Sequence, residues 1–325
     1  MIADRKCADQ NVIESMKNLT SIIYTLFIIA ATTGILASCG QSYEESKRVS
    51  RAQRQKLMRE DSLALKVGVL PTLDCLPMFV AKERALFDTA VDIRLKRYQA
   101  QMDCDEALRK GRLEGNVTDI VRAMRLRERG TQLDFISSTN AYWQLISNRK
   151  ARIKDIKQLN DKMVAMTRFS ATAFLADYAV DSVKMKDESV FRVQINNANL
   201  RLKMLLNNEM DAALLTEPQA TAARLQKNPM LMDTRDKDMW FGLIAFRSEA
   251  VRDAGRKRQM DAFVKGYNDA CDSINKYGVR NYADEIAKYC GVDSRTIAKL
   301  PKIRFKHIAE PRKSDIDKAA KWLKR

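Results

Sequence analysis

Short apolar stretches of strand length alternate with helical patterns along most of this chain, and this alternation restricts the fold more than any other feature. Leu65–Leu70 is an apolar strand signal, and Pro71 ends it. A helical pattern follows over 78–86, and 91–98 alternates as a strand. The order continues to a last helix over 314–322. Such a sequence predicts an α/β fold with mainly parallel sheets flanked by helices.

A second run of strands and helices begins near Ile153 and is expected to lie within the first. It contains a helix for which Ser170 is a suitable cap, and a strand over 212–215 that leads into Glu217. This arrangement predicts two lobes with a ligand cleft between them. The predicted lobes are 63–150 with 241–325, and 151–240, joined by crossovers near 147–152 and 216–245.

The net charge of the chain restricts its partners. Lysine and arginine number 58 against 41 acidic residues, a formal net charge of +17. The basic residues are dispersed among acids and form no stripe interleaved with aromatic side chains, so a nucleic-acid partner is not expected. A solvated basic surface that attracts anions is the preferred interpretation.

The N-terminal region predicts the compartment. An apolar run over 22–36 has the length of a signal-peptide core, and Lys17 supplies its positive flank. It leads into Leu36-Ala37-Ser38-Cys39, which resembles the lipobox of bacterial lipoproteins. That resemblance implies that Cys39 receives a diacylglycerol and becomes the new N-terminus, with fatty acids such as palmitate as the anchor. The alternative is an uncleaved anchor helix with an incidental cysteine, and either arrangement holds the domain at a membrane outside the cytoplasm.

Residues 1–15 do not suit a signal, because Asp4, Asp9 and Glu14 are acidic where positive charge is expected. Translation is therefore expected to begin at Met16, within a signal region that spans 1–38. Residues 39–62 are polar and predict a lipidated tether, part of which, Val49–Ser62, is expected to form a short polar helix.

Four cysteines remain beyond Cys7 and Cys39, an even number in an oxidising compartment. The favoured disulfide pairings are Cys75–Cys104 and Cys271–Cys290, and four buried free thiols are the alternative. No C-x-x-C motif occurs and His307 is the only histidine, so no metal site is expected.

From Leu65 to about Trp322 the chain resembles the type 2 periplasmic solute-binding proteins of ABC importers. The nearest branch includes nitrate, sulfonate, taurine and thiamine-pyrimidine-precursor binders. The segments that carry the resemblance are Lys66-Val67-Gly68-Val69, Pro77-Met78-Phe79-Val80-Ala81-Lys82, Gly115 to Asp119, Ile153 to Leu159, and Asp211-Ala212-Ala213-Leu214-Leu215-Thr216-Glu217-Pro218. The resemblance implies a monomer with no cofactor that binds a small solute and works with an ABC permease and its ATPase.

Ligand contacts in such a fold come from loops after the strands, where helix N-termini and backbone N–H groups face the cleft. Arg168, Ser170 and Thr172 form the sharpest candidate, because a guanidinium, hydroxyls and free N–H groups at a helix start suit a carboxylate, sulfonate or phosphate. The alternative is a plain capped helix with a surface arginine. The other candidate ligand-binding residues are Thr72, Asp74, Cys75, Asn116, Thr118, Asp119, Thr139, Asn140, Trp143, Asn197 and Glu217.

Several of these residues have a structural alternative that the sequence leaves open. Cys75 is equally explained as half of a disulfide, Asp119 and Asn197 as helix caps, Trp143 as hinge packing and Glu217 as a brace of the hinge.

Three functions compete at this point. The leading expectation is capture of a small, anionic solute by lobe closure and its delivery to an ABC permease. A ligand sensor or surface lipoprotein without a transporter is the second. The third is an enzyme that resembles the pyrimidine synthases of the same fold, and it is disfavoured because that chemistry needs histidine and iron ligands. No catalytic residue is therefore predicted.

Overall fold

The computed structural model describes residues 43–139, 141–186 and 189–325, which belong to two units, 1–63 and 64–325. The predicted signal region, its start at Met16 and the lipidation site Cys39 lie outside the described residues. In the first unit, helix α2 (Tyr43–Leu63) covers most of the expected tether and begins earlier than the short helix predicted there.

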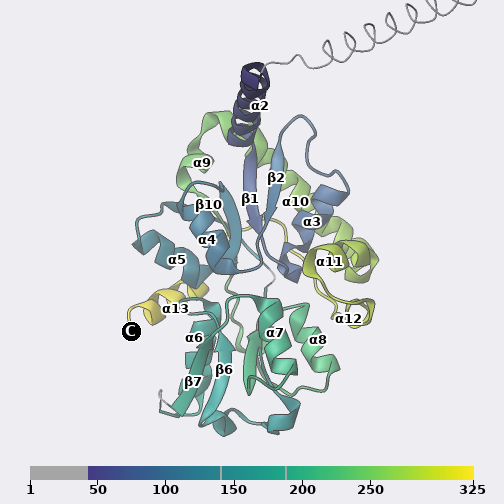
Figure 1. Cartoon of the computed structure of the whole chain (residues 1–325). Helices are drawn as coiled ribbons and strands as arrows, with labels where there is room; N and C mark the ends of the chain where they lie inside the picture. Colours follow the sequence, from purple (N-terminus) through teal and green to yellow (C-terminus); the bar gives the residue numbers. More distant parts are fainter. Residues whose placement is uncertain (1–42, 140, 187–188) are drawn as a thin grey trace, which may run out of the picture. The chain divides into compact units, whose positions relative to one another are not determined.

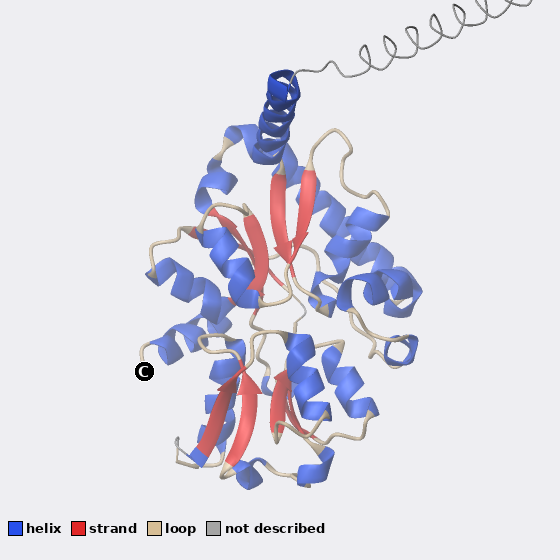
Figure 2. Cartoon of the chain, viewed as in Figure 1, coloured by secondary structure: helices blue, strands red, loops and turns tan. Residues whose placement is uncertain are grey.

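The first sheet of the second unit has five strands in the described chain, in the order β2-β1-β3-β10-β4. Figure 1 labels β1, β2 and β10 of this sheet, and Figure 2 shows its strands in red. Its strands are β1 (Leu65–Val69), β2 (Ile93–Arg97), β3 (Gly115–Asp119), β4 (Leu133–Ser138) and β10 (Gly242–Arg247). β1, β2 and β3 pair in parallel, and β10 pairs antiparallel with both β3 and β4. Four of these five strands therefore run in one direction, which confirms the prediction of a mainly parallel sheet.

The second sheet repeats this plan, with the order β7-β6-β8-β5-β9. Its strands are β5 (Gln144–Ser147), β6 (Lys162–Met166), β7 (Val190–Gln194), β8 (Ala212–Leu215) and β9 (Met230–Asp233). β5 is the antiparallel strand here and pairs with β8 and β9. The predicted lobe boundary at 150 and the crossover near 147–152 are therefore too late: β5 already belongs to the second sheet, and the first crossover is the segment 139–143.

Helices flank both sheets (Figure 2). They are α3 (Leu76–Glu83), α4 (Gln101–Arg109), α5 (Ile120–Glu128), α6 (Ala171–Ser182), α7 (Ala198–Leu206), α8 (Gln219–Leu225), α9 (Ser248–Arg252), α10 (Lys257–Tyr277), α11 (Ala283–Cys290), α12 (Ser294–Ala298) and α13 (Lys313–Leu323). α5, α8, α9 and β9 are short or rich in polar residues, so the apolar periodicity of the sequence does not reveal them.

β10 shows how the first sheet separates two apolar cores. Leu243 and Ala245 belong to the core beneath α4 and α5. Ile244 and Phe246 belong to the core beneath α3 and α10. Successive side chains of a strand point to opposite faces, so both faces of the sheet are buried, and the apolar runs of its strands follow from this.

The favoured disulfide pairings are wrong, because the four cysteines that the structure describes are free, buried thiols. Cys75 and Cys104 belong to different cores, on opposite faces of the sheet. The Cys104 Sγ atom lies where a β-carbon on Gly68 would stand, and the Cys271 thiol donates to the Lys306 carbonyl oxygen at 3.4 Å. All four residues belong to the two apolar cores as buried free thiols, which is the alternative that the sequence left open.

Candidate functional site

A pocket of about 80 Å³ lies between the two lobes, at the carboxyl ends of the parallel strands of both sheets. In lobe 1 its lining includes residues just after β1 and at the end of β3. In lobe 2 it includes residues that come after β6, β7 and β8. We call this pocket the cleft. Ligands bind in this position in open α/β sheets, because the strand ends leave polar backbone and helix starts exposed there. The described residues used below that line it are Thr72, Asp74, Gln101, Thr118, Asp119, Arg122, Trp143, Thr167, Ser170, Thr172, Asn196, Arg201 and Thr216.

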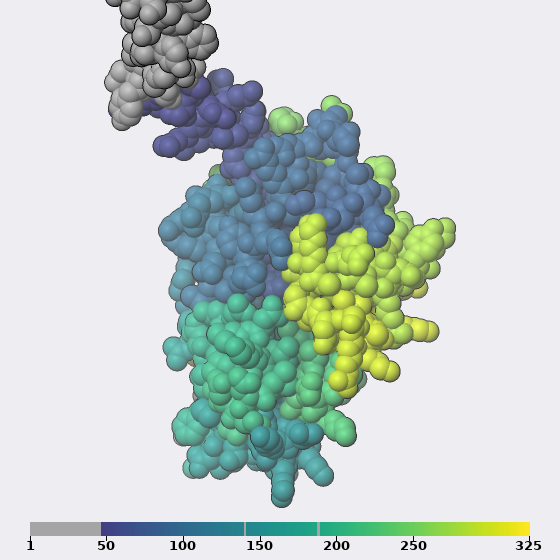
Figure 3. Space-filling model, turned by 45° about the vertical axis from the view of Figure 1, so that its right-hand side comes forward, coloured from purple at the N-terminus to yellow at the C-terminus, as the bar shows by residue number. Residues whose placement is uncertain are grey.

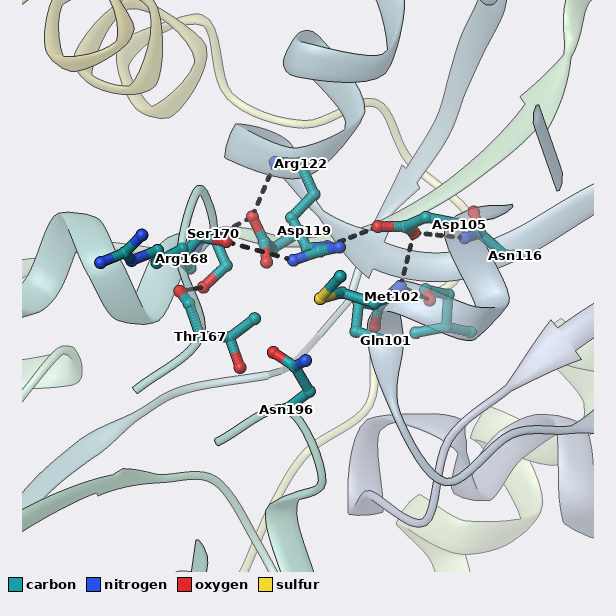
Figure 4. Close-up of polar contacts among 12 residues, drawn as sticks. Gln101, Met102, Asp105, Asn116, Asp119, Arg122, Thr167, Arg168, Ser170 and Asn196 are labelled. Carbon is teal, nitrogen blue, oxygen red and sulfur yellow. Dashed lines mark hydrogen bonds and ion pairs between the residues drawn. The ribbon is translucent and has the colours of Figure 1, made fainter. Parts of the chain in front are cut away.

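The lobe 1 wall of the cleft contains a buried ion pair. The Arg122 Nε atom donates to the Asp105 Oδ2 atom at 2.5 Å, and both side chains are less than a tenth exposed (Figure 4). Asp105 also accepts from Gln101 at 2.9 Å and from Asn116 at 3.1 Å. The guanidinium of lobe 1 is therefore compensated by a carboxylate of its own lobe.

Asp119, the last residue of β3, joins the two lobes. Its Oδ1 atom accepts from the backbone N–H of Arg122 in α5 at 3.0 Å and from that of Ala171 in α6 at 3.0 Å (Figure 4). Burial raises the pKa of Asp119 to about 7, against the opposing effect of Arg122 and of these two N–H donors. The carboxylate thus caps one helix in each lobe.

This contact corrects the expectation of free N–H groups at the start of α6. The N–H of Ala171 donates to Asp119, and the N–H of Thr172 donates to the Ser170 hydroxyl oxygen at 3.1 Å. The two following N–H groups donate to the Ser170 carbonyl oxygen. The helix start does bind a carboxylate, as its composition suggested, but the carboxylate belongs to the protein.

A second acidic group, Asp74, lies at the base of the lobe 1 wall. It accepts from the Thr139 hydroxyl at 3.1 Å. Burial raises the pKa of Asp74, and hydrogen bonds from Thr72 and Thr139 oppose that rise in part. Cys75, next to it, is fully buried and lies outside the lining of the cleft.

The lobe 2 wall contains a buried arginine among neutral oxygens. Arg201 donates to the carbonyl oxygens of Ile195 (3.0 and 3.1 Å) and Leu214, and to the Thr167 hydroxyl at 2.8 Å. Its side chain is 5% exposed, and no described carboxylate forms an ion pair with it. Burial alone lowers the pKa of Arg201 to about 10. A positive charge at this depth is stabilised only by dipoles.

One hydroxyl of the cleft lacks a partner within the described protein. The Thr118 Oγ1 atom is buried and makes no hydrogen bond to it, although Thr118 lines the cleft. A buried hydroxyl without a partner costs about 1–3 kcal/mol, so it is a candidate contact for a bound molecule.

The structure brings together seven of the predicted ligand-binding residues. Those that line the cleft are Thr72, Asp74, Thr118, Asp119, Trp143, Ser170 and Thr172. Ser170 caps α6 and Thr172 accepts from the Thr167 N–H at 2.8 Å, so both also hold the start of this helix in place.

The other predicted residues lie outside the lining of the cleft. Asn116 is buried behind it against Asp105, and Asn197 caps α7, accepting from two N–H groups. Glu217 accepts from the Tyr142 hydroxyl at 2.9 Å and pairs with Arg224, which is the arrangement of a hinge brace. Asn140 lies outside the described residues. Thr139 lines a different pocket, described below, while its hydroxyl contacts Asp74.

Arg168 is exposed and lines a neighbouring surface pocket with Arg109, Arg125 and Arg129. Only its carbonyl oxygen turns toward the cleft, where it accepts from the Arg122 Nη1 atom at 3.4 Å (Figure 4). Because Arg122 lines both pockets, the arginines of this surface pocket border one side of the cleft.

Sequence reasoning missed the two arginines that carry positive charge into the cleft. Arg122 and Arg201 lie inside helices, where an arginine in the sequence is ordinarily solvated. The sequence position of Asn196, a polar residue shortly after the end of a strand, could have identified it. Asn196 comes after β7 as Thr167 comes after β6, and both line the cleft.

His307, the one histidine of the sequence, lies away from the cleft. It lies on the surface, with its Nε2 atom 2.8 Å from the Asp272 Oδ1 atom. Over the described ranges, the structure has no cluster of three or more His, Cys, Asp or Glu side chains suited to a metal ion. Within the same ranges no helix is both long enough and apolar enough to span a bilayer.

Comparison with known proteins gives both a family and a fold. A family model described as NMT1/THI5 like matches residues 72–275. No curated protein matches the chain.

Solved structures similar to this chain have names of solute-binding proteins. The aliphatic sulphonate binding protein SsuA from Escherichia coli has a TM-score of 0.66 at 16% identity, over 81% of this chain and 87% of its own. A ligand-binding component of an ABC-type import system from Staphylococcus aureus, solved with zinc, has a TM-score of 0.66 at 15% identity, over 80% and 91%. The nitrate-binding protein NrtA from Synechocystis has a TM-score of 0.61 at 13% identity, over 77% and 74%. The chain therefore has the two-lobed periplasmic-binding-protein fold.

Proposed function

The chain belongs to the NMT1/THI5-like family, and from that premise we propose that it captures a small anionic solute outside the cytoplasm and delivers it to the permease of an ABC importer. The names of its structural neighbours support this role, since they are binding components rather than enzymes. In this role the two lobes open to admit the solute and close around it.

Arg201 is the observation that carries the anionic character of the solute. Its guanidinium is buried at the cleft and donates only to neutral oxygens in the described protein. An anion in the cleft would compensate this charge, and charge-assisted hydrogen bonds are about twice as strong as neutral ones. Arg122 cannot serve equally, because Asp105 already neutralises it.

The size of the cleft supports a small solute held by closed lobes. Its volume of about 80 Å³ is well below the ~300 Å³ or more of ordinary ligand pockets. Several contacts close the lobes around it, including Asp119 to Ala171 and the Leu73 N–H to the Glu217 carbonyl oxygen at 2.8 Å. We infer that the solute enters when these contacts open, and that its anionic group then meets Arg201 and Thr118.

The place of the protein in the cell is also part of the proposal. The apolar run over 22–36 and the motif that ends at Cys39 support export and lipidation, with 39–62 as the tether to the membrane. Radiolabelled palmitate should enter the protein and be absent from Cys39→Ser; equal labelling of both would exclude this anchor.

A thermal-shift screen followed by calorimetry tests the binding function. The panel contains nitrate, sulfonates, phosphonates, amino acids, and thiamine or pyrimidine precursors. A ligand at ~100 times its dissociation constant stabilises a protein by ~2.7 kcal/mol, so an anionic ligand should raise the melting temperature clearly. With that ligand, Arg201→Met should lose about 2–5 kcal/mol of binding free energy.

Arg168→Met is the matched control, because it removes the arginine that the sequence favoured and the structure places outside the cleft. It should leave the dissociation constant within about twofold. Retained affinity in Arg201→Met with loss in Arg168→Met would refute the assignment to the cleft. Hits confined to cationic compounds would refute the anionic class.

A further inference from the structure

A second cavity, of about 310 Å³, lies where both segments that join the lobes meet the C-terminal chain. The first crossover, 139–143, contributes Thr139 and Tyr142, and the return crossover, 234–241, contributes Arg235 and Trp240. The third side comes from residues 302–315, part of the segment drawn in yellow in Figure 3. We call this cavity the hinge pocket. Its volume is within the range of small-molecule sites.

The charges that line the hinge pocket are strongly unbalanced. Five cationic side chains face one carboxylate in its described lining: Arg235, Lys302, Arg304, Lys306 and Arg312 against Asp315. That carboxylate is fully buried and pairs with Arg312 at 2.7 Å. Arg235 pairs with Asp233, outside the lining, at 2.7 Å. The other three cations of the lining add to this excess of positive charge, and such an excess attracts anions.

The three further cations come from one short stretch of chain. Lys302, Arg304 and Lys306 are exposed, whereas Phe305 between them is buried, an alternation typical of an extended chain. Their backbone therefore spans roughly 13 Å at about 3.3 Å per residue. Charges spread over this length suit an anion with more than one charged group better than a single compact oxyanion.

An aromatic ring borders the same cavity. Trp240 is half-buried, and its Nε1 atom donates to the Asp238 Oδ1 atom at 3.2 Å, which helps to fix the indole. The ring of Tyr142 is already covered by the Arg235 guanidinium at 4.0 Å, so Trp240 is the ring left to stack on a planar group.

We propose that the hinge pocket binds a nucleoside diphosphate or a compound of that class, with its diphosphate along Lys302–Lys306 and its planar base on Trp240. Arginine and lysine supply the donors that phosphate oxygens accept. Because both crossover segments line the pocket, the bound molecule contacts the part of the chain that must bend when the lobes open. The site is separate from the cleft, and its assignment does not rest on which solute binds there.

Isothermal titration of the whole protein with adenosine diphosphate and with inorganic pyrophosphate tests the site. Both should bind saturably, and adenosine diphosphate at least fivefold more tightly, because only it has a base to stack. Lys302→Gln/Arg304→Gln should weaken both at least tenfold. Trp240→Leu should remove the advantage of adenosine diphosphate and leave pyrophosphate nearly unchanged.

Arg295→Gln/Lys299→Gln is the control, since it removes the same charge from exposed positions of the same C-terminal region outside the pocket. It should retain both affinities. Equal weakening in this control would reduce the effect to nonspecific surface charge and overturn the proposal, as would no saturable binding of either compound. Equal affinity for the two compounds in the unaltered protein would overturn the nucleoside class.

Discussion

The lobe 1 wall of the cleft buries an arginine together with a carboxylate, whereas the lobe 2 wall buries an arginine among carbonyl and hydroxyl oxygens. In lobe 1, Arg122 is paired with Asp105 before any ligand arrives. In lobe 2, Arg201 holds its position by donating to Ile195, Leu214 and Thr167. The first arrangement is complete as folded, and the second has no carboxylate partner among the described residues. The difference identifies lobe 2 as the wall whose charge the proposed anionic solute would compensate.

The largest effect should come from making lobe 1 resemble lobe 2. Asp105→Asn leaves Arg122 buried without its carboxylate, and loss of one partner of a buried pair costs about 3–5 kcal/mol. Urea unfolding should show this loss of stability. The same variant should bind an anion more tightly than the unaltered protein, because Arg122 has then lost its ion-pair partner.

Asp103→Asn is the control for that substitution, since Asp103 is exposed in the first turn of α4. It should cost less than about 1 kcal/mol, the usual contribution of a charge to a helix terminus. If Asp105→Asn and Asp103→Asn lose the same stability, the Arg122–Asp105 pair contributes no more than a surface charge. The contrast between the two cleft walls would then be wrong.

Asp119 predicts a pH dependence, because this carboxylate is shared between the two lobes. Its pKa rises from 3.8 to about 7 on burial, so the folded protein favours the protonated form. Stability from this group is complete below about pH 4 and is lost as the pH rises toward 7, by at most ~1.4 kcal/mol per pH unit. Asp119→Asn keeps an oxygen that caps both helices, and it should remove this part of the pH dependence.

Urea unfolding from pH 4 to pH 8 at constant ionic strength measures the effect. The difference in unfolding free energy between Asp119→Asn and the unaltered protein should increase up to about pH 7 and then level off. Asp74, whose pKa is also raised, is present in both proteins and cancels. A difference that does not change with pH would mean that the carboxylate titrates normally and does not join the lobes as described.

The fold and the acidic residues of the cleft were accessible to sequence reasoning, and the two buried arginines of the cleft were not. Strand and helix periodicity reflects local burial, so Leu65–Leu70 and 212–215 were recognised as strands. The role of Arg201 depends on its contacts with Thr167 after β6, Ile195 after β7 and Leu214 in β8, which no local sequence pattern records. Arg168 attracted attention because it precedes a helix start, yet its side chain turns outward. Cys75 and Cys104 are close in sequence but lie on opposite faces of a sheet, which spacing alone does not reveal.

A smaller effect separates recognition from stability. Thr118→Val removes a buried hydroxyl that has no partner in the described protein, so stability should stay the same or increase. Affinity for the cleft ligand should fall by roughly five- to tenfold, the equivalent of one neutral hydrogen bond. Calorimetry measures the affinity and thermal unfolding the stability.

Thr221→Val is the control for Thr118→Val, and it should change stability rather than affinity. The Thr221 hydroxyl is buried, accepts from the Arg224 Nη2 atom at 2.7 Å and lies outside the cleft. This variant should lose stability and keep its affinity. If both threonine variants behave alike, the Thr118 hydroxyl has no special part in recognition.

The smallest effect concerns the cysteines, which all lie in lobe 1 among the residues that the structure describes. Two disulfides there would stabilise lobe 1 by about 2–5 kcal/mol each. The two lobes would then differ in covalent cross-links as well as in the charges of their cleft walls. Burial raises the pKa of the thiols of Cys75, Cys104, Cys271 and Cys290, so they should be unreactive as well as unpaired. Reductant should leave the melting temperature of the folded protein unchanged, and a thiol reagent should modify these four cysteines only after unfolding. A lower melting temperature in reductant would show that a disulfide forms in lobe 1, and the contrast between the walls would no longer rest on charge alone.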